Sequence, residues 1–244
     1  MQHDVFDRPR PLAGTAVRCR PAAATDADAA APLIYASGTH EFSYFLGESS
    51  ERCIAFLAFA FGSSYGRFSW RRHRVAVDAG GNVVGIMAAH DGRAIAFDDP
   101  HVAWMLLRFF GLTRTIGMLL RGLVLESELP APKRRQILIA HCATHERVRG
   151  TGVFSALFDD ALLQGVFAVD AKHDRSEVVL DVLDSNPRAR ALYERLGFVA
   201  IERSRVRSVK LPAALASTRM RFERRAGRDG RPADSPCLDS PRDA

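Results

Sequence analysis

One stretch, residues 136–164, constrains the fold most, because a strand, a glycine turn and a helix follow one another in it. It begins with an apolar run at 137–140 that is short enough for a buried strand. The turn at 147–152 contains two glycines and two arginines. Such a turn directs unpaired backbone N–H groups and a helix N-terminus at an anion, so it is a candidate phosphate cradle. The helix is predicted from apolar residues on one face: Phe154, Leu157, Phe158, Ala161 and Leu162.

The glycine turn by itself has two interpretations. No Lys-Ser or Lys-Thr pair follows its second glycine, so it is not a Walker A loop, and its spacing is not G-x-G-x-x-G. Either Gly150 and Gly152 let the backbone approach an anionic ligand closely, or they serve only a tight strand-to-helix connection. A motif further along the chain decides between the two.

That motif lies at residues 184–198, DSNPRARALYERLGF, after a second predicted strand at 177–182. The pattern R-x-x-G-x-G at 147–152, followed by N-x-x-A-x-x-L-Y-x-x-L-G-F at 186–198, resembles the GNAT superfamily of acyl-CoA-dependent N-acetyltransferases. The second motif is long and specific, and the clear resemblance covers about residues 136–198. It implies an α/β fold with a central mixed, V-splayed β-sheet flanked by helices.

The chain before the cofactor stretch agrees with this fold in pattern. Strand, helix, helix, strand and strand is the order in which the GNAT fold begins. The expected elements are a strand at 16–20, a helix opened by a capping box at 25–28, a turn-rich connection at 38–47, a helix capped by Ser49 or Ser50, and a hairpin of strands at 70–77 and 82–89.

Residues 92–135 form an insertion between the third strand and the cofactor strand. Its central part, 101–125, is apolar with a helical pattern and is expected to be kinked or divided at Gly111 and Gly117. A structureless loop of this length is uncommon in a compact domain, so we predict a helical insertion. Its apolar faces either pack on the core or on a second copy of the chain, forming a homodimer, or cap the acceptor site. Exposed apolar surface usually marks an interface, which favours the first interpretation.

Residues 15–225 are predicted to form one acetyltransferase domain between two tails. Residues 1–14 are polar, and residues 226–244 have almost no large apolar side chains, so the second tail is predicted to be disordered. No secretory signal is predicted, because the N-terminal residues contain no apolar region. No membrane span is predicted either, because arginines interrupt the most apolar stretch, 101–125. The 4 cysteines are scattered, which fits free thiols and a cytoplasmic location.

The net charge of +6 comes from 34 basic residues, nearly all of them arginine. Such a charge is compatible with a nucleic-acid partner, but the sequence has no helix-turn-helix signature, zinc finger or aromatic RNA-binding motif. An anionic cofactor accounts for it equally well. We therefore predict no nucleic-acid partner.

The resemblance implies acetyl-CoA, or another acyl-CoA, as the cofactor and an amine as the acceptor. It places the pyrophosphate on the backbone N–H groups of the turn, and the pantetheine arm beside the splayed strand and the second motif. An arginine at the start of the turn shapes it, and a second one adds a charge-assisted contact. The implied cofactor residues are Ala140, Cys142, Arg147, Val148, Arg149, Gly150, Thr151, Gly152, Val153 and Asn186.

Tyr193 is implied as the general acid, because family members place a tyrosine of this motif near the thioester sulfur. A phenol there can protonate the departing thiolate. Periodicity alone allows a second interpretation, since Tyr193 shares a helix face with Leu192 and Leu196 and such a tyrosine is often core. Asn186 has a structural alternative as well, as the N-cap of the helix that begins at Pro187.

The general base is less well defined. Family members that act on proteins often carry a glutamate at the start of the cofactor strand, where this chain has Gln136. His141 has a suitable ordinary pKa and is our candidate base, although a hydrogen-bonded strand histidine is the alternative. Glu126, Glu128 and a water-mediated route also remain open.

No metal site is predicted. His141 and Cys142 point to opposite faces of a strand, and no fourth ligand lies at useful spacing from them and His145. The predicted function is acetyl transfer from acetyl-CoA to an amine by direct attack in a ternary complex. The alternative is a non-catalytic acyl-CoA-binding sensor or scaffold, which the missing carboxylate at position 136 favours.

Overall fold

The computed structural model describes residues 17–167, 177–202 and 208–223. Both predicted tails, 1–14 and 226–244, lie outside this part of the chain, as does Cys237. The predicted β-rich run after Phe198 is described only in part, because residues 203–207 fall outside it.

The described strands form one sheet in the order β1-β2-β3-β4-β5-β7-β6. Only β4 and β5 run parallel, and the other neighbouring pairs are antiparallel. The predicted mixed sheet is therefore confirmed. The strands are β1 (Arg18–Pro21), β2 (His73–Val77), β3 (Val83–Asp91), β4 (Gln136–Thr144), β5 (Glu177–Leu183), β6 (Phe198–Ala200) and β7 (Ser217–Phe222).

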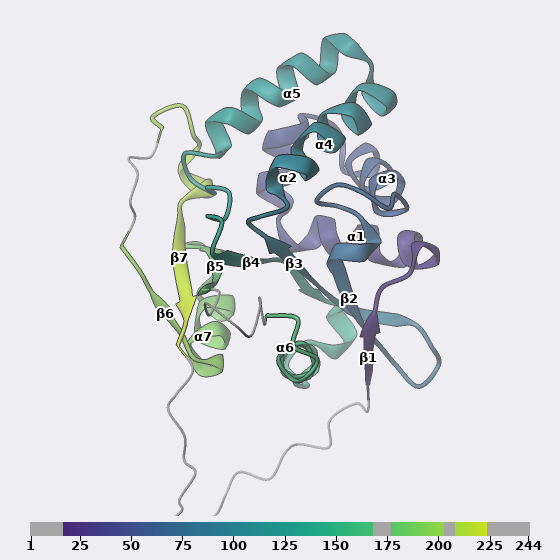
Figure 1. Cartoon of the computed structure of the whole chain (residues 1–244), viewed down its shortest axis with the longest axis vertical. Coiled ribbons are helices and arrows are strands. Elements are labelled where there is room, and N and C mark those ends of the chain that lie inside the picture. The colour runs from purple at the N-terminus through teal and green to yellow at the C-terminus, as the bar shows by residue number, and fades with distance from the viewer. Residues whose placement is uncertain (1–16, 168–176, 203–207, 224–244) are drawn as a thin grey trace, which may run out of the picture.

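Helices cover the two faces of the sheet unequally (Figure 1). Five helices lie on one face, where they bury one apolar cluster, and α6 and α7 lie on the other, where they bury a second. The α-helices are α1 (Ala27–Ser37), α2 (Thr39–Leu46), α3 (Ser50–Phe61), α4 (Ile95–Phe110), α5 (Leu112–Leu125), α6 (Val153–Leu163) and α7 (Pro187–Leu196). Short 3₁₀ turns are η1 (Ala24–Asp26), η2 (Trp70–Arg72), η3 (Glu146–Val148) and η4 (Ala213–Leu215).

The two central strands separate half-way along β4. Their parallel pairing runs from Gln136 opposite Glu177 to Ile139 opposite Leu180 and then stops. Beyond that point β4 is still paired with β3, as far as Thr144 opposite Gly85. The second half of β4 therefore has a free edge toward β5, which is the splay that the resemblance implied.

A β-bulge interrupts the pairing of β3 and β4 just past this separation. The register shifts between Ile86 and Ala88, opposite the segment 140–143 of β4. Within the bulge His141 has a φ of 53°, the only positive φ of a non-glycine residue in the described ranges. Such a conformation costs free energy in a side chain with a Cβ, and it re-aims the side chain.

Two local predictions before the sheet are wrong. The box at 25–28 does not cap α1, because the Asp26 carboxylate accepts hydrogen bonds from Ala23 N–H and from Arg20. The aromatic segment after Gly38 is helix α2 rather than a turn-rich connection. Phe42 and Leu46 on one side of it are buried, and tertiary packing thus overrides the local turn signals. The predicted Ser49 cap is confirmed, since its hydroxyl accepts from Arg52 N–H.

The insertion contains two helices that meet at Gly111, as predicted, whereas Gly117 lies inside α5 without a break. Helix α4 packs its inner face into the first cluster through Met105, Leu106 and Phe110. Among the described helices, none combines the length and apolar composition needed to cross a bilayer.

Candidate active site

The glycine turn before α6 has an open surface lined by backbone N–H groups. Gly150 and Gly152 have φ of 80° and 88°, and a Cβ added at either would meet no atom within 4 Å. Helix α6 begins after Gly152 without a side-chain cap. Within the described ranges, the N–H groups of Gly150, Gly152 and Val153 donate to no backbone carbonyl. An unoccupied set of donors at a helix N-terminus is what an anionic phosphate requires.

Two arginines of the turn form ion pairs within the loop region. Arg147 donates to Asp78 at 2.7 Å and so joins the turn to the β2–β3 hairpin. Backbone N–H groups of the hairpin turn, the first of them from Asn82, lower the pKa of Asp78, and Arg147 adds to this shift. Arg149 lies 3.4 Å from Glu146, and both side chains are well exposed. Arg147 therefore fixes the shape of the turn, while Arg149 is free to move toward a ligand.

Tyr193 is buried beside β4 on the α6 side of the sheet. Its ring packs edge-on against Phe154 of α6 and Phe198, and its hydroxyl donates to the Cys142 thiol. Burial raises the pKa of Tyr193 well above its ordinary value, so the phenol keeps its proton. Tyr193 is thus a core residue, and it also lies next to the strand that separates from β5.

Cys142 is not a nucleophile in this structure. Burial raises the pKa of its thiol to about 12. The thiol donates to the Ala140 carbonyl oxygen, which lies 3.6 Å from Cys142 Sγ. The reactive form of cysteine is the thiolate, which is not populated at neutral pH under these conditions. A transfer through an acyl-cysteine is therefore disfavoured.

His141 lies on the opposite face of β4 and is held by a second histidine. His73 Nδ1 donates to the Ser69 carbonyl at 2.8 Å, so its Nε2 is the acceptor for His141 Nδ1–H at 2.9 Å. These two bonds assign the tautomers and leave His141 Nε2 unprotonated. His141 is therefore a hydrogen-bonded strand histidine, as the alternative interpretation predicted. Its Nε2 atom still carries a lone pair that can accept a proton.

Aromatic packing keeps this pair neutral. The ring of His141 stacks on His73 and Phe68 and lies near Phe42 and His90. Burial lowers the pKa of His73 to about 4, and it lowers the pKa of His141 well below its ordinary value. A neutral imidazole at neutral pH can accept a proton, which a histidinium cannot.

His141 opens onto a cavity of about 450 Å³ between the sheet and the insertion. The floor is the segment Leu138–His141, where β4 separates from β5, together with His90 and Asp181. Helices α2, α4 and α5 form the walls, and α5 contributes Leu119, Leu123 and Leu125. The cap interpretation of the insertion thus has a structural counterpart, because α5 lines this cavity.

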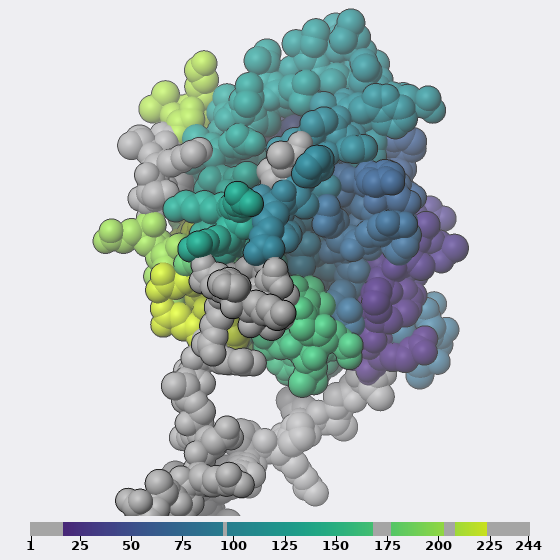
Figure 2. All heavy atoms as spheres, viewed as in Figure 1, coloured from purple at the N-terminus to yellow at the C-terminus, as the bar shows by residue number. Residues whose placement is uncertain are grey.

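The outer side of the same helix faces solvent (Figure 2). Leu112, Ile116 and Leu120 of α5 are more than half exposed, as is Trp104 of α4. This surface agrees with the homodimer hypothesis, which stays a prediction because the structure contains a single chain. The insertion therefore has an inner face at the cavity and the core and an outer face without a partner in this structure.

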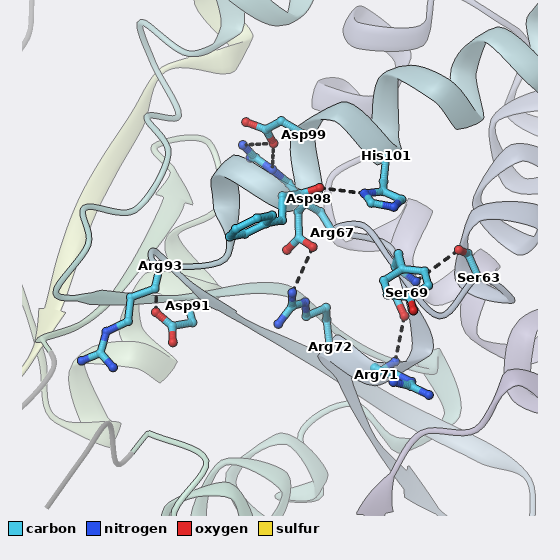
Figure 3. Close-up of polar contacts among 12 residues, drawn as sticks. Ser63, Arg67, Ser69, Arg71, Arg72, Asp91, Arg93, Asp98, Asp99 and His101 are labelled. Carbon is cyan, nitrogen blue, oxygen red and sulfur yellow. Dashed lines mark hydrogen bonds and ion pairs between the residues drawn. The ribbon is translucent and has the colours of Figure 1, made fainter.

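Two ion pairs attach the first turns of α4 to the loop before β2 (Figure 3). Arg67 binds Asp99 at 2.6 Å, and Arg72 binds Asp98 at 2.9 Å. In Figure 3 the two carboxylates point in different directions, each toward its own arginine. Arg67 and Asp99 also line the cavity, so the attachment of α4 shapes the cavity wall.

The other candidate residues have structural partners. Asn186 caps α7 by accepting from Ala189 N–H, in agreement with its alternative role. Gln136 is buried, accepts from Lys133 N–H and donates to Glu177, away from the cavity. Glu128 is buried and accepts from Ser217, whereas Glu126 lines the cavity. Of the two glutamates considered as bases, only Glu126 is therefore available to an acceptor.

Three residues at or next to the cavity were missed from the sequence: Glu41 and His90, which line it, and His73, which is hydrogen-bonded to His141. A signal for the histidines exists in the strand register, because His73 lies opposite Ala88, two residues from His90 on the same face. Glu41 gave no such signal, since its segment was expected to be a turn. Among the described residues no group of three or more side chains could hold a metal ion.

Comparisons with known proteins agree with this fold. The model of the acetyltransferase (GNAT) family matches residues 41–198, more than half of the chain. The chain therefore belongs to the GNAT acetyltransferase family, and it is an acyltransferase of the N-acetyltransferase type. Acetyl or acyl-CoA is the cofactor expected for this family. A comparison with curated proteins found no match.

Solved structures share the fold at low sequence identity. An N-acetyltransferase from Staphylococcus aureus superimposes with a TM-score of 0.62 at 15% identity, covering 84% of this chain and 100% of its own. A protein from Corynebacterium glutamicum, described as histone acetyltransferase HPA2 and related acetyltransferase, gives 0.54 at 19% identity, covering 87% of this chain and 98% of its own. At these identities the likeness shows the fold alone.

Proposed function

We propose that this protein transfers an acetyl group from acetyl-CoA to a primary amine bound in the cavity beside His141, by direct attack in a ternary complex. The observation that carries the proposal is the juxtaposition at the free edge of β4. A protonated Tyr193 lies on one face of this edge, and an unprotonated His141 Nε2 on the other. An acid and a base thus flank the only segment of β4 that β5 leaves unpaired.

The residues present fit acetyl-CoA at the glycine turn. The open donors of Gly150, Gly152 and Val153 suit its pyrophosphate, and the helix N-terminus adds favourable electrostatics. Arg149, whose partner Glu146 is exposed, supplies a mobile positive charge. Thr151 and Val148 complete the turn, since the Thr151 hydroxyl donates to the Val148 carbonyl at 2.8 Å. The cofactor supplies an activated acetyl thioester.

Each catalytic step then has a group of this chain. Backbone groups at Ala140 and Cys142, which have no strand partner on the β5 side, hold the arm of the cofactor and stabilise charge on the carbonyl oxygen. His141 Nε2 accepts a proton from the amine as it attacks, and His73 Nε2 stabilises the resulting imidazolium by accepting a hydrogen bond from His141 Nδ1–H. Tyr193 protonates the departing thiolate.

The test combines cofactor binding with thiol release. Isothermal titration with acetyl-CoA is performed on the wild type and on Gly150→Asp, whose added carboxylate opposes the pyrophosphate. We expect Gly150→Asp to lose binding by at least about 100-fold, because like charges at one site cost several kcal/mol. Gly165→Asp is the matched control, since Gly165 also has a positive φ, of 67°, but follows the other end of α6.

Thiol release is followed with the wild type against a panel of amines. Amine-dependent release establishes the transferase. Absence of acetyl-CoA binding by the wild type contradicts the proposal altogether. Binding of acetyl-CoA without thiol release on every amine favours the alternative of an acyl-CoA sensor. The relevant difference is then Gln136, where family members that act on proteins often carry a glutamate. Its side chain is hydrogen-bonded to Lys133 and Glu177.

A further inference from the structure

The cavity beside His141 has an extensive apolar wall. Helix α5 provides one side of this wall, and the ring of Phe42 from α2 lies 5.9 Å from the His141 ring. The wall therefore begins at the proposed base and continues away from it. The apolar lining residues are Phe42, Phe45, Phe68, Val102, Leu119, Leu123, Leu125 and Leu129.

Two polar atoms in the same cavity are enclosed and lack a partner. The Oε2 atom of Glu41 and the Nδ1 atom of His90 are buried without a hydrogen bond in the described part of the chain. His90 is only 3% exposed, and its ring lies 5.4 Å from that of His141. An unpaired buried polar atom is costly, so a ligand that pairs with it gains that free energy.

Apart from Glu126, the remaining charges of the wall are already paired. Arg67 binds Asp99, and Asp181 binds Arg219 through two bonds. Burial raises the pKa of Glu41, and a cation next to this carboxyl would restore its charged form. The cavity thus offers an unpaired carboxylate oxygen, Glu41 Oε2, to a cation, but within the described residues it offers no unpaired guanidinium to an anion.

We propose that the acceptor is a primary amine on an uncharged, apolar body, with its ammonium recognised by Glu41 and His90 and its body packed against the wall of α2 and α5. This inference rests on the proposed function. After loss of one proton to solvent, the amine nitrogen bonds to the acetyl carbon as the C–S bond breaks. Its second proton passes to His141, and the thiolate receives one from Tyr193. The products are an amide and free CoA.

Other amine classes fit these residues less well. An amino acid brings a carboxylate, which would lie near Glu41 with no free guanidinium to neutralise it. A diamine or polyamine brings a second cation, which the leucines of α5 would strip of water without a partner. Glu126, at the end of α5, is the one cavity carboxylate that could receive a second cation, so diamines are the sharpest competitors.

The test uses matched pairs of small amines and reads binding separately from turnover. Protein saturated with CoA is titrated with 2-phenylethylamine and with phenylalanine, which differ by one carboxylate, and with hexylamine and 1,6-diaminohexane, which differ by one amine. We expect the uncharged bodies to bind at least about 10-fold more tightly, the factor that 1.4 kcal/mol represents. Thiol release with acetyl-CoA is recorded on the same four compounds.

Variants locate the site. Glu41→Gln is expected to weaken binding of hexylamine while acetyl-CoA binding is unchanged, and Glu51→Gln, an exposed glutamate in the first turn of α3, serves as control. Leu123→Lys should weaken binding of the apolar amines and spare CoA. Equal or tighter binding of phenylalanine or 1,6-diaminohexane would overturn the inference, as would no binding of either apolar amine. Thiol release with charged amines alone overturns it and leaves the proposed function intact.

Discussion

The two faces of β4 are built in different ways. Toward α6 and α7, which we propose as the cofactor side, the important groups are backbone N–H donors and a tyrosine that packs in an apolar cluster. Toward α2 and α5, which we propose as the acceptor side, they are side chains from separate segments that meet only in the folded chain. The cofactor side depends on local geometry, and the acceptor side depends on tertiary packing.

This difference fits the two tasks. A pyrophosphate is the same in every reaction of a CoA enzyme, so donors fixed by one turn and one helix end suffice. An acceptor varies, and selectivity comes from the shape and polarity of a pocket. In this chain an insertion, residues 92–135, which lies outside both recognition motifs, contributes part of the pocket wall. Variants that affect one side and spare the other test the comparison.

The largest effect is expected from Tyr193→Phe on the cofactor side. Loss of the hydroxyl removes the proposed acid, and kcat should fall by about 10²–10⁴-fold while acetyl-CoA binding is retained. The control is Tyr35→Phe, a second buried tyrosine whose hydroxyl bonds Ser43 and Ser50 in the other cluster. Steady-state kinetics on both variants measure kcat and the KM for acetyl-CoA. If the two lose the same activity, the role of Tyr193 is only structural.

A smaller loss, about 10²-fold in kcat, is expected from His141→Asn on the acceptor side. Asparagine tolerates the positive φ of this position, so the bulge is retained. Because burial lowers the pKa of His141, the acid limb of the wild-type kcat profile should lie below pH 6.5. His73→Gln, which removes the acceptor for His141 Nδ1–H, should lower kcat less and leave the KM for acetyl-CoA unchanged.

An exposed histidine, His101 of α4, provides the control for these variants. His101→Asn should keep wild-type kcat across the pH range. Unchanged kcat in His141→Asn would show that the base is elsewhere, with Glu126 the next candidate because it lines the same cavity. The comparison of the two faces would then stand, but with a carboxylate as the base on the acceptor side.

The smallest effect is on folding rather than catalysis. Burial lowers the pKa of His73 to about 4, and it lowers the pKa of His90 as well. The unfolded chain then binds more protons than the folded chain between pH 6.5 and about 4, so stability falls as the pH falls through this window. Urea unfolding should show a loss of up to about 1.4 kcal/mol per pH unit for each buried histidine.

His90→Leu should reduce this pH dependence, and His101→Asn should not, because His101 is exposed. An unchanged slope in His90→Leu would mean that His90 is not buried in its neutral form. The three buried histidines all belong to the acceptor side, so the pH dependence of folding should originate there. Helices α6 and α7, on the proposed cofactor side, contain no histidine.

The elements that the sequence predicted well are those with strong local signals. The apolar period of α6 and the N-cap at Asn186 are each determined within a few residues. Helix α2 was missed because its stability comes from Phe42 and Leu46 in the core and not from its propensity. The predicted capping box at 25–28 does not form, and Asp26 instead accepts two hydrogen bonds from Arg20.

The candidate site shows the same difference between parts that local sequence specifies and parts that tertiary packing specifies. The sequence by itself located the glycine turn before α6 and the helix that carries Tyr193, because a glycine turn and a helix N-terminus are local structures that a short motif can specify. Only the tertiary structure decided which way His141 points. Simple alternation from Ile137 and Ile139 would place it under α6, and the bulge turns it to the other face. His73, His90 and Glu41 come from distant segments, and only the folded sheet and helix α2 bring His90 and Glu41 to the cavity and His73 to His141.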